Sequence, residues 1–329
     1  MVRYGLGSNS YILYGDEGTP YSLAATRTKQ FGLISEDVSP PRPNKKTPLP
    51  GSGSRRAPHV WAQDVNEYAF DVPFHVQHAD APFHAALGAK AVTSQDPDTV
   101  PASGDEYTRT LFTETSILPT ISVEYGAKDL DVLQQFIGTK ASLGLTCRKG
   151  ESLKGNMGLV CASEAHDTTT PTFQTPVIPT NEPFRFSHIQ HCKLFQPGTQ
   201  TLIKNVASLD GFDFKWNPGL EAVPHGGSGR ENYSVVEGNP EGLYDMKISV
   251  TAQDADLFTR AADNSGLFDL EIALARTIGT GGVLTDAFIA RLYNCTVLDA
   301  PLSMPASGRV TTEIPLGPLS TDLEIRTPA

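Results

Sequence analysis

The stretch LYDMKISVTAQDADLFTRAADNSGLFDLEIAL, residues 243–274, reads as a strand, a short helix and a second strand. Apolar and polar residues alternate from Tyr244 to Thr251. A period of two turns one face of a strand to a core and the other to water or a neighbour. Asp254 stands where a helix N-cap is expected, and Asn264 and Gly266 can end that helix in the left-handed conformation. A helix of about two turns is not stable alone, so we expect it to cover one end of a sheet.

The rest of the chain is also rich in strand patterns. Such patterns lie at residues 9–14, 66–77, 106–112, 119–126, 141–148, 153–162, 184–195, 206–215, 243–252, 267–275, 287–299 and 308–315. Short helical patterns lie near 79–87, 129–137 and 254–263; Asp129 is the expected cap of the middle one and Gly138 its expected end. Many strands, frequent Gly and Pro, and few helices favour a mainly β fold of packed sheets, a sandwich or barrel, with short flanking helices.

Composition excludes several classes of protein. The net charge of -11 argues against a basic DNA-binding protein. The start of the chain lacks the apolar stretch of a signal peptide, and no apolar run approaches the roughly 20 residues of a membrane helix, so no membrane insertion is expected. Four cysteines stand far apart without a CxxC motif, which predicts buried free thiols in a reducing cytoplasm: Cys147, Cys161, Cys192 and Cys295.

The opening stretch has a partner earlier in the chain, at residues 68–88. A shift of 174 residues pairs Asp71 with Asp245, Val76 with Val250, Asp80 with Asp254 and Ala81 with Ala255. Both segments run from an alternating strand into a short helix that begins at Asp. Any two amphipathic strands share the alternation, but the shared order of elements favours duplication of one small β-fold. The expected domains are then 1–138 and 139–329.

Three stretches break the strand pattern. Residues 36–58 hold six prolines, and five basic residues against two acidic ones give them a net charge of +3, which leaves -14 for the rest of the chain. This proline density excludes a packed helix or a central strand. The segment is either a solvated loop or an extended arm that lies on an acidic surface of a neighbouring subunit. The candidate arm residues are Arg42, Lys45, Lys46, Arg55 and Arg56. Segments 164–183 and 217–242 are too long for simple hairpin turns, and such loops are usually functional or disordered.

The chemically interesting residues do not form a recognisable site. His188, His191 and Cys192 lie in a predicted strand, where 188 and 192 share one face and 191 points to the other. His75, His78 and His84 flank the first short helix without a paired carboxylate or cysteine motif. The glycine-rich runs at 225–231 and 279–282 lack the strand, helix and lysine of a phosphate loop. We therefore expect no catalytic, cofactor-binding or metal-binding residues and no enzyme activity.

Several segments, taken in order, resemble the tail tube (major tail) proteins of long-tailed bacteriophages. The turn YGDEGT at 14–19 is similar to a turn near the start of that family. FDVPFHVQHADAPFHAALGA, at 70–89, resembles its strand and helix ending in Leu-Gly. TISVEYG (120–126), FIGTKASLGLTCRKGESLKGNMGLVCAS (136–163) and VASLDGFDFKWNPGLEAV (206–223) resemble its later strands. The match is one of order and pattern over nearly the whole chain, and residues 36–58 are unusually basic and proline-rich for it.

The resemblance implies a structural virion protein of two packed β-sheets flanked by a helix. Such subunits form rings whose sheets line a lumen, and the rings stack into the tail tube that conducts the genome. The implied partners are copies of the chain itself, a tape-measure protein, and tail tip and terminator proteins, with assembly in the host cytoplasm. DNA passes without specific binding, and an acidic wall suits that role. A duplicated chain would form a trimer with pseudo-sixfold symmetry; an unduplicated one would form a hexamer.

Other classes make different predictions. A related tail component, such as a terminator or distal ring protein, shares the fold but differs in its ability to polymerise. A β-sandwich adhesion module would carry exposed aromatic clusters on its loops, where this chain has mostly Thr, Pro, Gly and charge. An enzyme on a β-scaffold would need a convergent polar set.

Overall fold

The computed structural model describes residues 10–23, 27, 29–30, 45–48, 59–62, 68–76, 83–94, 105–128, 131–167, 172–175, 181–224, 232–238, 243–251, 266–298 and 311–328. The strands are β1 (Ser10–Asp16), β2 (Lys29–Gln30), β3 (Lys45–Pro48), β4 (His59–Ala62), β5 (Tyr68–His75), β6 (Gly88–Thr93), β7 (Tyr107–Glu114), β8 (Ile121–Ala127), β9 (Val132–Arg148), β10 (Lys154–Cys161), β11 (Ser163–Asp167), β12 (Ile189–Phe195), β13 (Leu202–Asn205), β14 (Leu209–Trp216), β15 (Leu220–Pro224), β16 (Asn232–Glu237), β17 (Tyr244–Thr251), β18 (Phe268–Ile278), β19 (Leu284–Val297), β20 (Thr311–Gly317) and β21 (Ser320–Pro328). One helix, α1 (Phe83–Leu87), and 3₁₀ turns at Phe186–His188 and Thr280–Gly282 accompany them.

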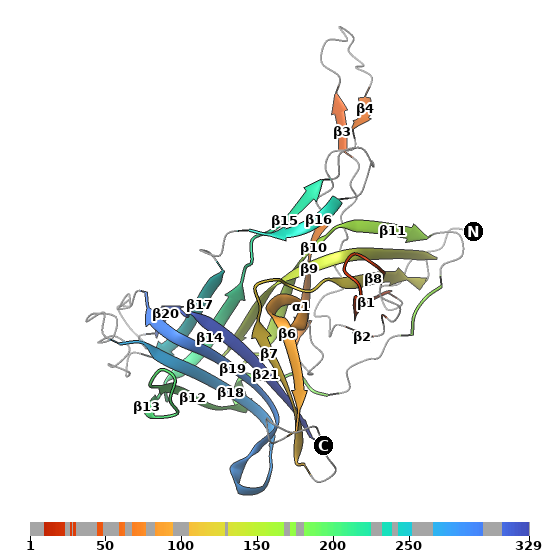
Figure 1. Ribbon diagram of the computed structural model, residues 1–329. Coiled ribbons are helices and arrows are strands. Elements are labelled where there is room, and N and C mark those ends of the chain that lie inside the picture. Colours follow the sequence, from red (N-terminus) through yellow and green to blue (C-terminus); the bar gives the residue numbers. More distant parts are fainter. Residues whose placement is uncertain are drawn as a thin grey trace.

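Two antiparallel sheets pack face to face (Figure 1). Sheet I has the order β5–β10–β9–β14–β17–β20. Sheet II has the order β13–β12–β18–β19–β21–β7–β6. A smaller sheet III, β2–β1–β8–β9–β11, continues from sheet I because β9 belongs to both. The predicted mainly β architecture of packed sheets is confirmed as a sandwich.

The core lies between sheets I and II. Phe214 and Trp216 point inward from β14 and meet edge to face, and Leu270 and Ile272 point inward from β18. Phe83 of α1 is fully buried between Phe112 and Phe288, with ring centroids 5.5 and 5.9 Å away. The helix expected near 79–87 is therefore confirmed over its second half, and its Phe83 fills part of the core.

Every predicted strand segment contains a strand, but the sequence missed the shorter and terminal ones. These are β6, β11, β13, β15, β16 and β21, together with the two-stranded pair β3–β4 and the two-residue β2. The segment 217–242, expected to be a long loop, instead contains strands β15 and β16, which pair with each other. The helix predicted at 254–263 and its cap Asp254 lie outside the described residues, while Gly266 has the expected positive φ of 89°.

The helix predicted at 129–137 is wrong, because Val132–Arg148 is one long strand; its expected cap Asp129 lies outside the described residues. Leu133 and Phe136 are both buried although they point to opposite faces of β9, since sheet III is covered on both sides at this point. A strand buried on both faces loses its period of two, and apolar residues three apart then imitate a helix. Gly138 does have positive φ, of 64°, but it lies inside β9.

The proposed domain join between residues 138 and 139 falls inside β9, and residues from both sides of it share one core. The two segments related by the 174-residue shift form β5, at one edge of sheet I, and β17, next to its other edge. Both turn their alternate apolar residues to that core. The duplication itself stays a prediction.

All four cysteines are buried and free, as predicted. Burial raises the pKa of Cys147 and of Cys161 to about 12, so these thiols are unreactive in the folded chain.

Candidate functional site

An ion-pair network crosses the outer face of sheet II. Its centre is Glu324 on β21, whose side chain is fully buried among three arginines. The carboxylate lies 2.6 Å from Arg291, 2.7 Å from Arg326 and 3.0 Å from Arg109, which come from β19, β21 and β7. Burial by itself raises the pKa of Glu324, but the charges of Arg291 and Arg326 outweigh it and lower that pKa. Glu324 is therefore ionised and holds the three arginine side chains on the outer face of the sheet.

The network continues through Glu271 on β18. Arg291 donates to Glu271 at 2.8 Å, and His191 on β12 lies 2.7 Å from the other carboxylate oxygen. Burial alone would raise the pKa of Glu271, but the hydrogen bond from His191 and the charge of Arg291 lower it to about 2. The network thus spans β12, β18, β19, β21 and β7. No side chain in it is more than 20% exposed.

The low pKa of Glu271 predicts an acid-sensitive contribution to stability. An acid whose pKa is depressed from 4.5 to about 2 stabilises the fold fully above the unfolded value and loses that effect as the pH falls toward 2. Each pKa unit is worth about 1.4 kcal/mol, so the effect is on the order of 3 kcal/mol. We expect Glu271→Gln to be less stable than wild type at neutral pH, and the difference between their free energies of unfolding in urea to shrink as the pH falls to about 2. A difference independent of pH would contradict this, and Glu151→Gln, at an exposed ion pair, is the control.

Sheet I carries a charge quartet on its outer face. Asp213 faces Lys247 across the β14–β17 pair, and Lys215 faces Asp245. Lys247 lies 3.0 Å and Lys215 3.6 Å from Asp245. The hydrogen bond from Lys247 lowers the pKa of Asp245 against a weaker effect of burial. Exposed pairs of this kind add little stability, but they leave the quartet with no net charge.

Beside the quartet, the middle of the outer faces of β9 and β10 is built from short side chains. The outward positions there are Ser142, Gly144, Thr146, Asn156 and Gly158, with Lys140, Arg148, Lys154 and Val160 toward the ends of this paired stretch. This part of sheet I therefore presents a smooth surface without aromatic or long apolar groups.

A buried carboxylate also organises sheet III. Glu124 on β8 is fully buried and accepts hydrogen bonds from the Tyr11 hydroxyl and the Arg27 guanidinium, each at 2.9 Å. It also accepts from the Gln174 backbone N–H at 3.4 Å, while Phe173 meets the Tyr11 ring edge to face. Burial, then the hydrogen bond to Glu124, raises the pKa of Tyr11. One carboxylate thus holds Arg27 and residues 172–175 against the sheet.

The candidate arm residues are only partly within the described chain. Lys45 and Lys46 lie in β3, which pairs with β4 in a hairpin that stands away from the sandwich (Figure 1). Arg42, Arg55 and Arg56 lie outside the described residues. The expectation that proline excludes this segment from a central strand agrees with an isolated two-stranded ribbon.

The hairpin β15–β16 is fixed at its base. Glu237 at the end of β16 lies 2.7 Å from Lys140 on β9 and accepts the Leu118 N–H at 3.0 Å. The loop that holds the glycine-rich run 225–231 lies outside the described residues, apart from its flanking strands.

The histidines and cysteine singled out in the sequence serve separate purposes. His191 and Cys192 point to opposite faces of β12 as predicted, His191 to the ion-pair network and Cys192 to the core. His188, however, belongs to a 3₁₀ turn before the strand. Among the described residues, no three His, Cys, Asp or Glu side chains lie close enough together to hold a metal ion. His78 is outside the described residues.

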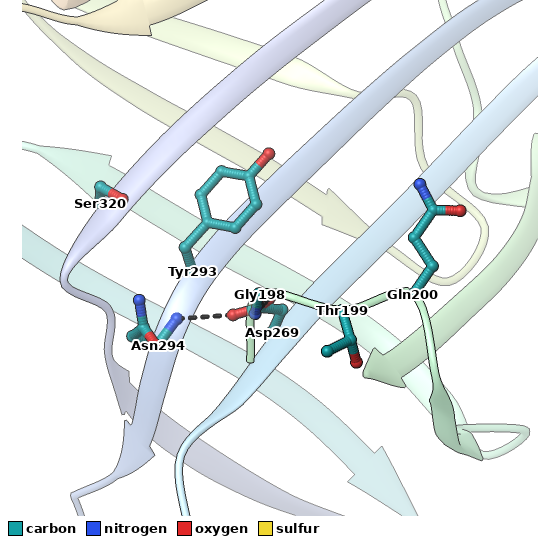
Figure 2. Close-up of a pocket in the computed structure, with 7 residues that line it drawn as sticks. All are labelled: Gly198, Thr199, Gln200, Asp269, Tyr293, Asn294 and Ser320. Carbon is teal, nitrogen blue, oxygen red and sulfur yellow. Dashed lines mark hydrogen bonds between the residues drawn. The ribbon is translucent and has the colours of Figure 1, made fainter. Parts of the chain in front are cut away.

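An open hollow of about 470 Å³ lies beside the turn after β12, and Figure 2 shows the residues that line it. Asp269 is its only ionisable carboxylate, and both oxygens are occupied, by the Gly198 N–H at 3.1 Å and the Asn294 N–H at 2.8 Å. Tyr293 donates instead to Asp322, at 3.0 Å. Asp269 therefore holds the turn in place through its hydrogen bond from Gly198, and the residues that line the hollow offer no convergent reactive groups.

Comparison with known families gives one clear match. A family model described as "Phage tail tube protein" matches residues 7–317, nearly the whole chain. A comparison with curated proteins found no match. In the described part of the chain, no helix is long and apolar enough to cross a membrane.

Proposed function

Since this chain belongs to the phage tail tube protein family, we propose that its copies form closed rings that stack into the tube of a phage tail. Family membership makes it a structural protein of the virion tail. The family match over residues 7–317 carries the proposal, and the β-sandwich fits a wall element that performs no reaction.

The edges of sheet I support ring formation. Among the described residues, β5 pairs on one side only, with β10, and residues 311–314 of β20 pair only with β17. Six antiparallel strands place β5 and β20 in opposite directions, so β20 of one copy can join β5 of a rotated copy in antiparallel fashion. The edge strand β5 also carries a proline, Pro73, which limits uncontrolled pairing.

The paired charges on both outer faces support passage of DNA without retention. Lysines and arginines that already face carboxylates offer few free cations to phosphate groups, and a net charge of -11 repels them at longer range. In this proposal the tube forms around a tape-measure protein in the host cytoplasm and meets tip and terminator proteins at its ends. No catalytic role is proposed.

Electron microscopy of the purified protein at rising concentration, with mass measured in solution, tests the proposal. Closed rings or hollow tubes are the expected result. Three subunits per ring would support the duplicated chain, and six would support a simple hexamer. A protein that stays monomeric even with tail tip complex added would overturn the ring proposal, and rings that never stack would favour a terminator or distal ring protein.

The basic arm is proposed to fix the contact between rings. Reversing the charge of Lys45, Lys46, Arg55 and Arg56 should shorten tubes and make them more sensitive to salt, while single rings persist. The reason is that the arm's charge opposes the acidic remainder of the chain, an attraction that salt screens over about 8 to 10 Å. Tube length against salt concentration, read by electron microscopy, measures the effect. Exchanging Lys for Arg and Arg for Lys at the same positions keeps the charge and is the control; unchanged tubes after reversal would refute the role.

A further inference from the structure

Strand β9 contains a β-bulge where it passes from sheet III to sheet I. Ile121 of β8 faces Thr139, but Val123 faces Phe136, so β9 has one extra residue at this point. Gly138 lies in that extra stretch with φ of 64°, as in a bulge that needs a left-handed residue. On the other side of β9, pairing changes from β10 to β11 around Ala162. The bulge is therefore the joint between the two sheets.

One carboxylate from a distant turn holds this joint. Glu17, in the turn that follows β1, accepts the Gly138 N–H at 2.8 Å and the Ser122 hydroxyl at 2.8 Å through the same oxygen. Its other oxygen accepts the Tyr21 N–H at 2.8 Å. Ser122 is the residue of β8 opposite the bulge. We call Glu17, Tyr21, Ser122 and Gly138 the Glu17 cluster.

The space around Gly138 shows how closely the cluster fits. A Cβ atom at this position would stand 2.4 Å from the Tyr21 ring and 2.9 Å from the Ala162 Cβ. The Tyr21 ring thus covers the glycine, while Tyr21 itself has a positive φ of 62°. Glu17 therefore fixes the backbone of its own turn and the backbone of the bulge at once.

We propose that Glu17 is a positioning residue for ring closure, because it sets the angle at which sheet III leaves sheet I. The inference rests on the proposed ring assembly. Subunits joined head to tail form a closed ring only when the rotation per subunit divides a full turn; otherwise they form open spirals. Among the described residues, β11 of sheet III pairs only with β9, on the same side of β9 as β10 and the edge strand β5, so a copy that joins β5 also lies next to sheet III. A changed angle at the joint would therefore change the contact with the neighbouring copy once per subunit, and the ring would not close.

The variant Glu17→Ala removes both acceptor oxygens and leaves the core between sheets I and II untouched. We expect it to fold, to lose hydrogen-exchange protection at the Gly138 amide at least tenfold, and to assemble into open spirals or rings of mixed subunit number. Glu17→Gln keeps one acceptor oxygen and should fall between Ala and wild type. Glu151→Ala, at an exposed ion pair with Lys154, removes the same charge elsewhere and is the matched control.

Negative-stain electron microscopy and native mass spectrometry of the assemblies measure the shape and subunit number of the rings. Hydrogen-exchange protection of the Leu143 amide in sheet I shows whether each variant is folded. Uniform closed rings of wild-type subunit number from Glu17→Ala would overturn the inference while leaving the ring proposal intact. Absence of rings from wild type as well would overturn the ring proposal itself. If Glu17→Ala loses protection throughout sheet I, Glu17→Gln decides: mixed or open rings support the positioning role, and uniform rings overturn it.

Discussion

Replacing Glu324 with alanine is expected to lower the free energy of unfolding by about 3 to 5 kcal/mol, the usual cost of removing one partner from a buried ion pair. The carboxylate is fully buried, and its loss leaves Arg109, Arg291 and Arg326 close together without their shared anion. Typical domains have only about 5 to 15 kcal/mol of stability, so much of the variant should be unfolded under mild denaturant. Urea titration followed by tryptophan fluorescence measures the change, since Trp216 lies in the core.

Two comparisons make the Glu324 result specific. Glu151→Ala removes a carboxylate from an exposed pair and should cost no more than about 1 kcal/mol. Glu324→Gln keeps the shape and one acceptor and should cost less than alanine but far more than the Glu151 variant. A loss below about 1 kcal/mol for Glu324→Ala would show that the arginines find other partners and that the network does not depend on its central anion.

Replacing Glu124 with alanine is expected to cost a similar amount, about 3 to 5 kcal/mol, and to release a defined part of the chain. Arg27 would lose its buried partner, and residues 172–175 would lose the acceptor that holds the Gln174 N–H. In this variant, hydrogen exchange should therefore increase much more at the Gln174 amide than at the amides of sheets I and II. The double variant Glu124→Gln with Arg27→Gln should recover part of the loss, because no unpaired charge stays buried.

Equal exchange at Gln174 in wild type and Glu124→Ala would contradict the proposed anchoring, even if stability falls. The loss in free energy of unfolding of the double variant should be smaller than the sum of the losses of Glu124→Gln and Arg27→Gln. A larger loss than that sum would contradict the pairing of Glu124 with Arg27. Both measurements use the intact chain, and neither depends on assembly into rings.

Strands with a period of two or with a continuous apolar run could be predicted from the sequence, but the first part of β9 has neither pattern and could not. The segment 244–251 alternates because its outer face carries Asp245 and Lys247, and the structure places it as expected. In β9 the period fails because Leu133 and Phe136 are buried on opposite faces. Strands β15 and β16 were missed because Gly and Pro in 217–242 indicated a loop, although Glu237 fixes the hairpin to Lys140.

The carboxylates that organise the molecule gave almost no signal in the sequence. In the sequence, Glu124 and Glu324 look like ordinary polar positions of amphipathic strands, because a charged residue is normally assigned to the solvent-exposed face. Most of their partners lie far away along the chain: Arg291 lies 33 residues from Glu324, and Arg27 lies 97 residues from Glu124. Only the pairing of strands brings these groups together. The one local hint is LEIR at 323–326, where Glu324 and Arg326 share a face and form an ion pair.

Strand β9 makes sheets I and III one mechanical body. Hydrogen bonds between neighbouring strands can be broken one after another by a pull on an end, but load passing along β9 is carried by covalent bonds. Between Phe136 and Ala141 the main chain itself connects the two sheets, and the bulge at Gly138 is the point where it bends. We expect a tube built from this subunit to flex at the contacts between copies, while sheets I and III of each copy move together.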